Sequence, residues 1–116
     1  MSRRLQRLNA LLRRELADLL RRQLRDPRLA EIVTVTRADV SSDLALARVY
    51  ISVLGDAEAK ASTLRALTAA APFMRFHLRS RLTIKRIPNL QFLLDESIEE
   101  AAHILDLMKR IPGAKP

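Results

Sequence analysis

Residues 32–54 read IVTVTRADVSSDLALARVYISVL, and this stretch decides the fold because it predicts two strands and the turn between them. Residues 32–40 are rich in β-branched side chains, which favour extended backbone. In residues 44–54, apolar side chains occupy every second position: Ala45, Ala47, Val49, Ile51 and Val53. Because the connection Ser41-Ser42-Asp43 is short and polar, we expect the two strands to form an antiparallel hairpin.

A long amphipathic helix is predicted before the hairpin, over residues 3–25. Leucines recur in it at spacings of three and four residues, which is the period of a helix: Leu5, Leu8, Leu12, Leu16 and Leu19. Asp26-Pro27 should end this helix, since the residue before a proline is pushed away from helical backbone.

A helix with a break in it is predicted after the hairpin. Asp56 is a good N-cap for a helix over residues 57–71. Pro72 interrupts the pattern, because proline lacks the N–H of a helix interior but suits the first turn of a new helix. We therefore expect a second helix over residues 73–82 and an interhelical kink at Ala70, Ala71 and Pro72.

One more strand and one more helix follow. Residues 90–94 read as a strand, and Ser97 and Glu100 match a capping box that begins a helix over residues 97–110. Four apolar residues of this helix are expected to face inward: Ile98, Ala102, Leu105 and Met108. The whole order predicts an α+β fold in which helices cover a three-stranded sheet, as a single domain over residues 1–111 with a flexible tail at 112–116.

Composition points to a polyanionic partner. The 116 residues hold 21 Lys and Arg against 13 Asp and Glu, a formal net charge of +8. Residues 1–28 contain nine arginines and three acidic residues, and residues 75–86 contain five basic residues and no acidic one. The rest of the chain is net negative, so two blocks produce the positive field. With no cysteine, no long apolar run and no secretory signal, we expect a cytoplasmic protein without disulfides.

Two groups of basic residues are the candidate RNA-binding site. The first follows the predicted kink: Arg75, Arg79, Arg81, Lys85 and Arg86. The second forms a stripe on the first helix, within roughly 40° at the helical period and opposite the leucines: Arg3, Arg7, Arg14, Arg21 and Arg25. Arginine suits phosphate recognition, although either group can instead be an ordinary solvated face.

No catalytic or metal-binding motif is visible. The two histidines, His77 and His103, lack ligand spacing. The acidic residues around Ser97 are better explained by helix capping than by acid–base chemistry. Of the few aromatic residues, Phe73 and Phe92 are expected in the core, while Phe76 and Tyr50 can be partly exposed. We therefore expect no cofactor and no enzyme, and recognition of RNA by shape and phosphate rather than by base stacking.

The order αββα-kink-αβα resembles a type II KH domain, and four stretches resemble the ribosome-binding factor A family. They are RLNALLRRELADLLRRQLRDPRL at 7–29, VTVTRADVSSDLALARVYISVLGD at 33–56, APFMRFHLRSRL at 71–82 and IPNLQFLLDESIEEAAHI at 87–104. A KH domain grips RNA through a Gly-x-x-Gly loop, which this chain lacks. The family resembles KH domains but has a kink written Ala-x-Gly, where this chain has Ala70-Ala71-Pro72. Proline keeps the break but removes an N–H donor, so contact between RNA and backbone amides is less expected there.

The resemblance implies a bacterial assembly factor that takes part in ribosome biogenesis. Such a factor binds the free small ribosomal subunit near its neck and assists late maturation and 5′-end processing of its ribosomal RNA. Expected partners are the small subunit and its RNA, with ribosomal proteins near the neck as further candidates, and a monomer suffices. A nuclease or RNA-modifying enzyme, and a DNA-binding protein of the nucleoid type, are the alternatives that assays of cleavage and of competition with duplex DNA would separate.

Overall fold

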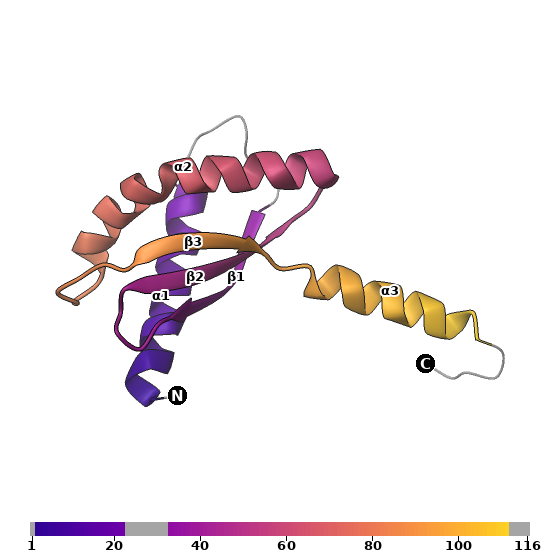
Figure 1. The fold of residues 1–116 in the computed structure, drawn as a ribbon, viewed down its shortest axis with the longest axis horizontal. Coiled ribbons are helices and arrows are strands. Elements are labelled where there is room, and N and C mark those ends of the chain that lie inside the picture. Colours follow the sequence, from indigo (N-terminus) through magenta and orange to yellow (C-terminus); the bar gives the residue numbers. More distant parts are fainter. Residues whose placement is uncertain (1, 23–32, 112–116) are drawn as a thin grey trace.

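The computed structural model describes residues 2–22 and 33–111, which form three helices and one sheet (Figure 1). In chain order the elements are α1 (Arg3–Arg22), β1 (Val33–Val40), β2 (Leu46–Val53), α2 (Ala57–Arg81), β3 (Asn89–Leu94) and α3 (Ser97–Lys109). The predicted α+β class is confirmed, and so is the element order except that one helix, α2, stands where two were predicted. The predicted end of the first helix, including Arg25, Asp26 and Pro27, lies outside the described residues.

The sheet has the strand order β1-β2-β3. β1 and β2 are antiparallel, as the hairpin pattern predicts, whereas β3 returns parallel to β2 after the long α2 crossover. The register of β1 shifts between Val35 and Arg37. This extra residue explains why Val35 and Ala38, three positions apart, are both buried, while Thr36 and Arg37 are not.

The core lies between one face of the sheet and the two helices α1 and α2. Leu12, Leu16 and Leu19 of α1 are fully buried, and Leu5 and Leu8 pack partly against the same cluster. The inward residues of the hairpin meet them: Val35, Ala38, Val40, Ala47, Val49, Ile51 and Val53. The leucine stripe and the strand alternation thus describe the two sides of one hydrophobic core.

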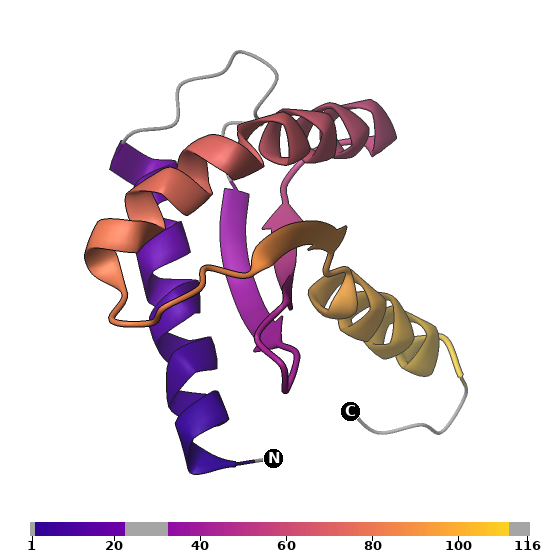
Figure 2. The same cartoon turned by 60° about the vertical axis from the view of Figure 1, so that its left-hand side comes forward.

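Helix α2 is continuous, which corrects the predicted helix–break–helix. Asp56 caps it as expected, accepting a 2.8 Å hydrogen bond from the Ala59 N–H. Pro72 lies inside the helix, and the predicted break at Ala70, Ala71 and Pro72 is wrong. Proline removes one backbone hydrogen bond and favours a kink, and Figure 2 shows α2 bending along its length. Buried residues on both sides of Pro72, Leu67 and Met74, hold the two halves to the same core.

Helix α3 is where the structure differs most from the sequence pattern. It extends away from the sheet (Figure 1) and has no buried residue. Ile98 and Leu105 are 68% and 52% exposed, and Ala102 and Met108 are exposed as well, so the predicted inward face is wrong. The expected capping box is also not formed: Glu96 is the N-cap residue and makes no side-chain capping bond. The helical period identifies an apolar face but cannot say what covers it.

Candidate nucleic-acid interface

The end of α2 and the 82–88 connection form a basic hollow with a volume of about 410 Å³. It is lined by Arg75, Arg79, Ile84, Lys85, Arg86 and Ile87. Four of the five basic residues that the sequence grouped after Pro72 therefore meet around one depression. Arg81 does not line the hollow. The five basic residues also differ in whether their side chains are engaged in contacts within the protein.

Arg75 is used to hold the connection in place. Its Nε donates to the carbonyl of Pro88 at 3.1 Å, and its Nη2 donates to the carbonyl of Ile87 at 2.9 Å. Ile87 and Pro88 are both buried, so their carbonyls need donors from within the protein. The Arg75 guanidinium therefore shapes the basic hollow, with much of its donor capacity directed inward.

Arg81 joins α2 to α1. Its Nη1 lies 2.7 Å from Asp18 Oδ2 and 2.9 Å from Glu15 Oε2, and all three side chains are partly buried. The hydrogen bonds to Asp18, and then to Glu15, raise the pKa of Arg81. The hydrogen bond from Arg81 lowers the pKa of Asp18 below its ordinary value. Arg81 is thus held by two carboxylates, of which Asp18 also pairs with Arg21 and Arg22. The expected role of Arg81 in RNA binding stays a prediction that this pairing disfavours.

Arg79, Lys85 and Arg86 remain available. All three are exposed, and none forms an ion pair with a residue in the described ranges 2–22 and 33–111. They lie on the rim of the hollow that Arg75 shapes. Three unpaired cations around a firmly held connection can contact phosphate groups without first breaking an internal bond.

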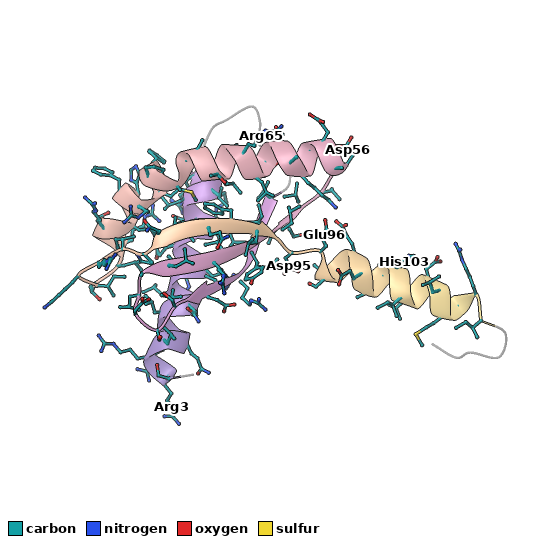
Figure 3. The ribbon with its side chains drawn as sticks, viewed as in Figure 1. Arg3, Asp56, Arg65, Asp95, Glu96 and His103 are labelled. Atoms are coloured by element: carbon teal, nitrogen blue, oxygen red, sulfur yellow. The ribbon has the colours of Figure 1, made fainter. Side chains whose placement is uncertain are left out.

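The arginine stripe of α1 is present over its described part. Arg3, Arg7 and Arg14 are exposed and make no ion pair with any residue that the structure describes, and Figure 3 shows Arg3 at the open end of α1. Arg21 is exposed but lies 3.0 Å from Asp18 Oδ1. Arg25 lies outside the described residues. Arg4 and Arg13, which the stripe omits, are exposed too.

The two basic groups lie on either side of one helix junction. The contact of Arg81 with Glu15 and Asp18 brings the end of α2 against α1, and Figure 2 shows the 82–88 connection crossing in front of α1 in that view. Asp18 borders the arginine stripe at the helical period. Arg14 lies next to Glu15 in α1, whereas Arg7 and Arg3 lie roughly two to three turns nearer the start of the helix. We call the six cations of the two groups that make no ion pair with a described residue the basic surface: Arg3, Arg7, Arg14, Arg79, Lys85 and Arg86.

Two exposed phenylalanines lie on α2 among its basic residues; the sequence allows Phe76 to be partly exposed but predicts Phe73 in the core. Phe73 is 41% exposed and Phe76 is 65% exposed, so the expected core position of Phe73 is wrong, whereas Phe92 is buried as expected. The His77 ring makes edge contacts with both, at centroid distances of 4.4 Å and 5.4 Å. Their spacing of three residues shows that they share a face, and exposed rings of this kind can stack on bases.

The acidic residues serve structural contacts. Lys60 Nζ lies 2.8 Å from Glu99 Oε2 and 3.6 Å from Glu96 Oε1. The Ser97 hydroxyl and then the Thr36 hydroxyl, which lies 2.6 Å from Asp95 Oδ2, lower the pKa of Asp95 to about 2. Within residues 2–22 and 33–111, no group of three or more His, Asp or Glu side chains is arranged to hold a metal ion. None of the described helices is long and apolar enough to cross a membrane.

Comparison with known proteins identifies one family. The model of the family described as ribosome-binding factor A matches residues 4–108. Ribosome-binding factor A of Synechocystis sp. is 40% identical over 114 residues, which cover 97% of this chain and 86% of the relative. The Pseudomonas entomophila protein of the same name is 43% identical over 109 residues, covering 92% of this chain and 82% of the relative.

Solved structures agree with the sequence comparison. The crystal structure of ribosome-binding factor A from Thermus thermophilus matches with a TM-score of 0.68 and 33% identity, over 78% of this chain and 94% of that one. A homology model of the Thermus thermophilus factor, fitted into a cryo-EM map of its complex with the 30S subunit, matches with a TM-score of 0.63 and 33% identity, over 76% and 91% of the two chains. The fold, the nearly full-length match and the shared identity together show that the chain belongs to the ribosome-binding factor A family.

Proposed function

We propose that this protein binds the free small ribosomal subunit and assists late maturation and 5′-end processing of its ribosomal RNA. It acts as a cytoplasmic monomer, without a cofactor and without catalysing a reaction. The observation that carries the proposal is the basic surface, whose six cations are exposed and unpaired within the described part of the chain. The 30S complex of the related Thermus thermophilus factor supports the same target.

The basic surface binds RNA through phosphate positions and helix shape. Arg79, Lys85 and Arg86 surround the hollow, and the stripe of α1 extends the positive field on the other side of the junction. Base stacking contributes little, because α2 offers only Phe73 and Phe76 as exposed aromatic rings. Ribosomal proteins near the binding site at the neck are further candidate contacts.

Pro72 changes how the middle of α2 meets RNA. A proline has no N–H group, so this position cannot donate a backbone hydrogen bond to a phosphate. The adjoining Phe73, Phe76 and Arg79 are exposed instead. In this chain, side chains of α2 therefore make the contact in place of the backbone of a Gly-x-x-Gly loop.

Co-sedimentation tests the proposal. Wild-type protein should sediment with free small subunits, and much less with large subunits or complete ribosomes, in moderate salt. Arg79→Glu combined with Lys85→Glu should weaken binding by roughly tenfold or more. The slope of log affinity against log salt should become shallower by about two, because about two phosphate contacts are lost. Binding that is equal for all particles, or an unchanged affinity and salt slope in the double variant, would contradict the proposal.

A matched control lies on the same helix. Arg65 is exposed on α2, far along the helix from the hollow (Figure 3), so Arg65→Glu changes the net charge as Arg79→Glu does. Arg65→Glu should leave subunit binding nearly unchanged. The comparison is with Arg79→Glu alone. An equal loss of subunit binding in Arg65→Glu and Arg79→Glu would show a general charge effect rather than a binding surface. An excess of duplex DNA that displaces the subunit would favour a DNA-binding protein instead.

A further inference from the structure

Helix α3 presents an apolar face that no described element covers. Six large apolar side chains in residues 98–111 are between 38% and 68% exposed: Ile98, Ile104, Leu105, Leu107, Met108 and Ile111. At about 100° per residue, Ile98, Leu105 and Met108 fall on one side of the helix with Ile104 next to Met108, whereas Leu107 and His103 fall on the other side. An exposed apolar stripe of this kind marks an interaction surface.

The start of α3 is held by the domain. Lys60 of α2 contacts Glu96 and Glu99, and Asp95 receives hydrogen bonds from Thr36 of β1 and from the Ser97 N–H. Figure 3 shows Asp95 and Glu96 at the junction from which α3 leaves β3. The helix is therefore attached at its first turn, while its apolar face stays uncovered by the described elements.

The charge of α3 is opposite to that of the basic surface. Residues 95–110 contain five acidic residues against Lys109 and Arg110, a net charge of −3 in a chain whose net charge is +8. Three of these carboxylates are paired: Glu96 and Glu99 with Lys60, and Asp106 with Arg110. RNA phosphates repel such a segment. A second copy of α3 carries the same net negative charge, which disfavours the pairing of two α3 helices. A partner with an apolar groove and a basic rim is complementary in both respects.

We infer that α3 docks, as an amphipathic helix in a groove, onto a basic protein component of the small subunit. This inference rests on the proposed function, because that function brings the chain to a particle containing RNA-bound proteins, and RNA-bound proteins carry basic surfaces. The basic surface then holds RNA, while α3 supplies a separate contact of opposite charge to protein.

Leu105→Gln combined with Met108→Gln tests the apolar contact. Glutamine has a helix propensity close to that of leucine and methionine, so the helix should persist. Affinity for purified small subunits should fall by roughly tenfold, while the salt slope, the affinity for protein-free small-subunit RNA and the Tm stay at wild-type values. His103→Gln, on the opposite side of α3, is the matched control and should bind as the wild type does.

Glu100→Lys tests the charge of the partner. A basic protein groove predicts affinity for the subunit reduced by roughly two- to fivefold, whereas an RNA contact predicts tighter binding. Tighter binding, or a parallel loss of affinity for protein-free RNA in the double glutamine variant, would overturn the inference in favour of RNA.

Other results test whether the apolar face of α3 is covered by its own domain or by a second copy of the chain. A lower Tm of the double glutamine variant would show that α3 packs on its own domain, and a wild-type dimer that this variant dissolves would show a second copy; either overturns the inference. If wild-type protein binds subunits and the variant binds equally well, the inference fails and the proposed function stands. If wild-type protein does not bind subunits, both fall.

Discussion

Arg75 and Arg81, which precede and follow Arg79 on α2, make contacts within the protein that Arg79 does not make. Arg75 donates to two backbone carbonyls and Arg81 pairs with two carboxylates of α1, whereas Arg79 is exposed and unpaired within the described residues. All three come from one short basic stretch. The comparison teaches that clustered positive charge in a sequence contains both structural and available cations, and that tertiary contacts decide which is which.

Arg75→Ala should produce the largest loss of stability. It leaves the carbonyls of Ile87 and Pro88, both in buried residues, without their donors, which costs about 2 kcal/mol. For a domain of this size that corresponds to a fall in Tm of roughly 8–10 °C. Thermal unfolding followed by circular dichroism measures it. Arg79→Ala, one turn away, is the control and should change stability by less than about 0.5 kcal/mol; equal effects would remove the distinction between the two arginines.

Arg81→Ala should lower Tm by a smaller amount, a few degrees. Glu15 loses its ion pair with Arg81, and Asp18 keeps only its ion pairs with the exposed Arg21 and Arg22, so two neighbouring, partly buried carboxylates lose the cation that they share. Because the hydrogen bond from Arg81 holds the pKa of Asp18 down, the variant should also show a higher pKa for Asp18, measurable by titration of its carboxyl resonance. Adding Asp18→Asn to Arg81→Ala should recover part of the lost stability. An Arg81→Ala protein with wild-type Tm would mean that the ion pairs do not join α1 to α2.

Thr36→Val should have a still smaller effect, confined to a defined pH range. The folded-state pKa of Asp95 is about 2, below its ordinary value of 3.8. Its contribution to stability is therefore complete above about pH 4 and is lost as pH falls through about 2. Removing the Thr36 hydroxyl should raise this pKa toward 3.8, so the variant is slightly less stable at neutral pH and matches the wild type below pH 2. A constant difference at every pH would assign the effect to packing instead.

Much of the fold could be predicted from the sequence because its patterns are local. The leucine spacing of α1, the alternation in β2 and the Asp56 cap each reflect contacts within one element or between adjacent elements. Pro72 misled the prediction because proline weakens a helix locally, whereas Leu67 and Met74 keep both halves of α2 on the core. The apolar face of α3 misled it because helical period does not specify a neighbour.

The candidate site could be predicted only in part, for a related reason. The sequence located both basic blocks, but it could not show that Arg75 reaches Ile87 and Pro88 or that Arg81 meets Glu15 and Asp18, which lie more than 60 positions away. Exposure of Phe73 likewise depends on how α2 lies on the sheet. Pairing across distant segments is a tertiary property, and it separates the available cations from the structural ones.

Neutralising the stripe of α1 should have the smallest effect on stability and so tests the other side of the comparison. Arg7→Gln combined with Arg14→Gln removes two exposed cations that make no ion pair with a described residue. Because glutamine is nearly as good a helix former as arginine, Tm should change by no more than about 2 °C. If these cations bind phosphates, the salt slope of subunit binding should fall by about two. An unchanged slope would confine the RNA contact to Arg79, Lys85 and Arg86, and a marked fall in Tm would place Arg7 and Arg14 with Arg75 and Arg81 among the structural arginines.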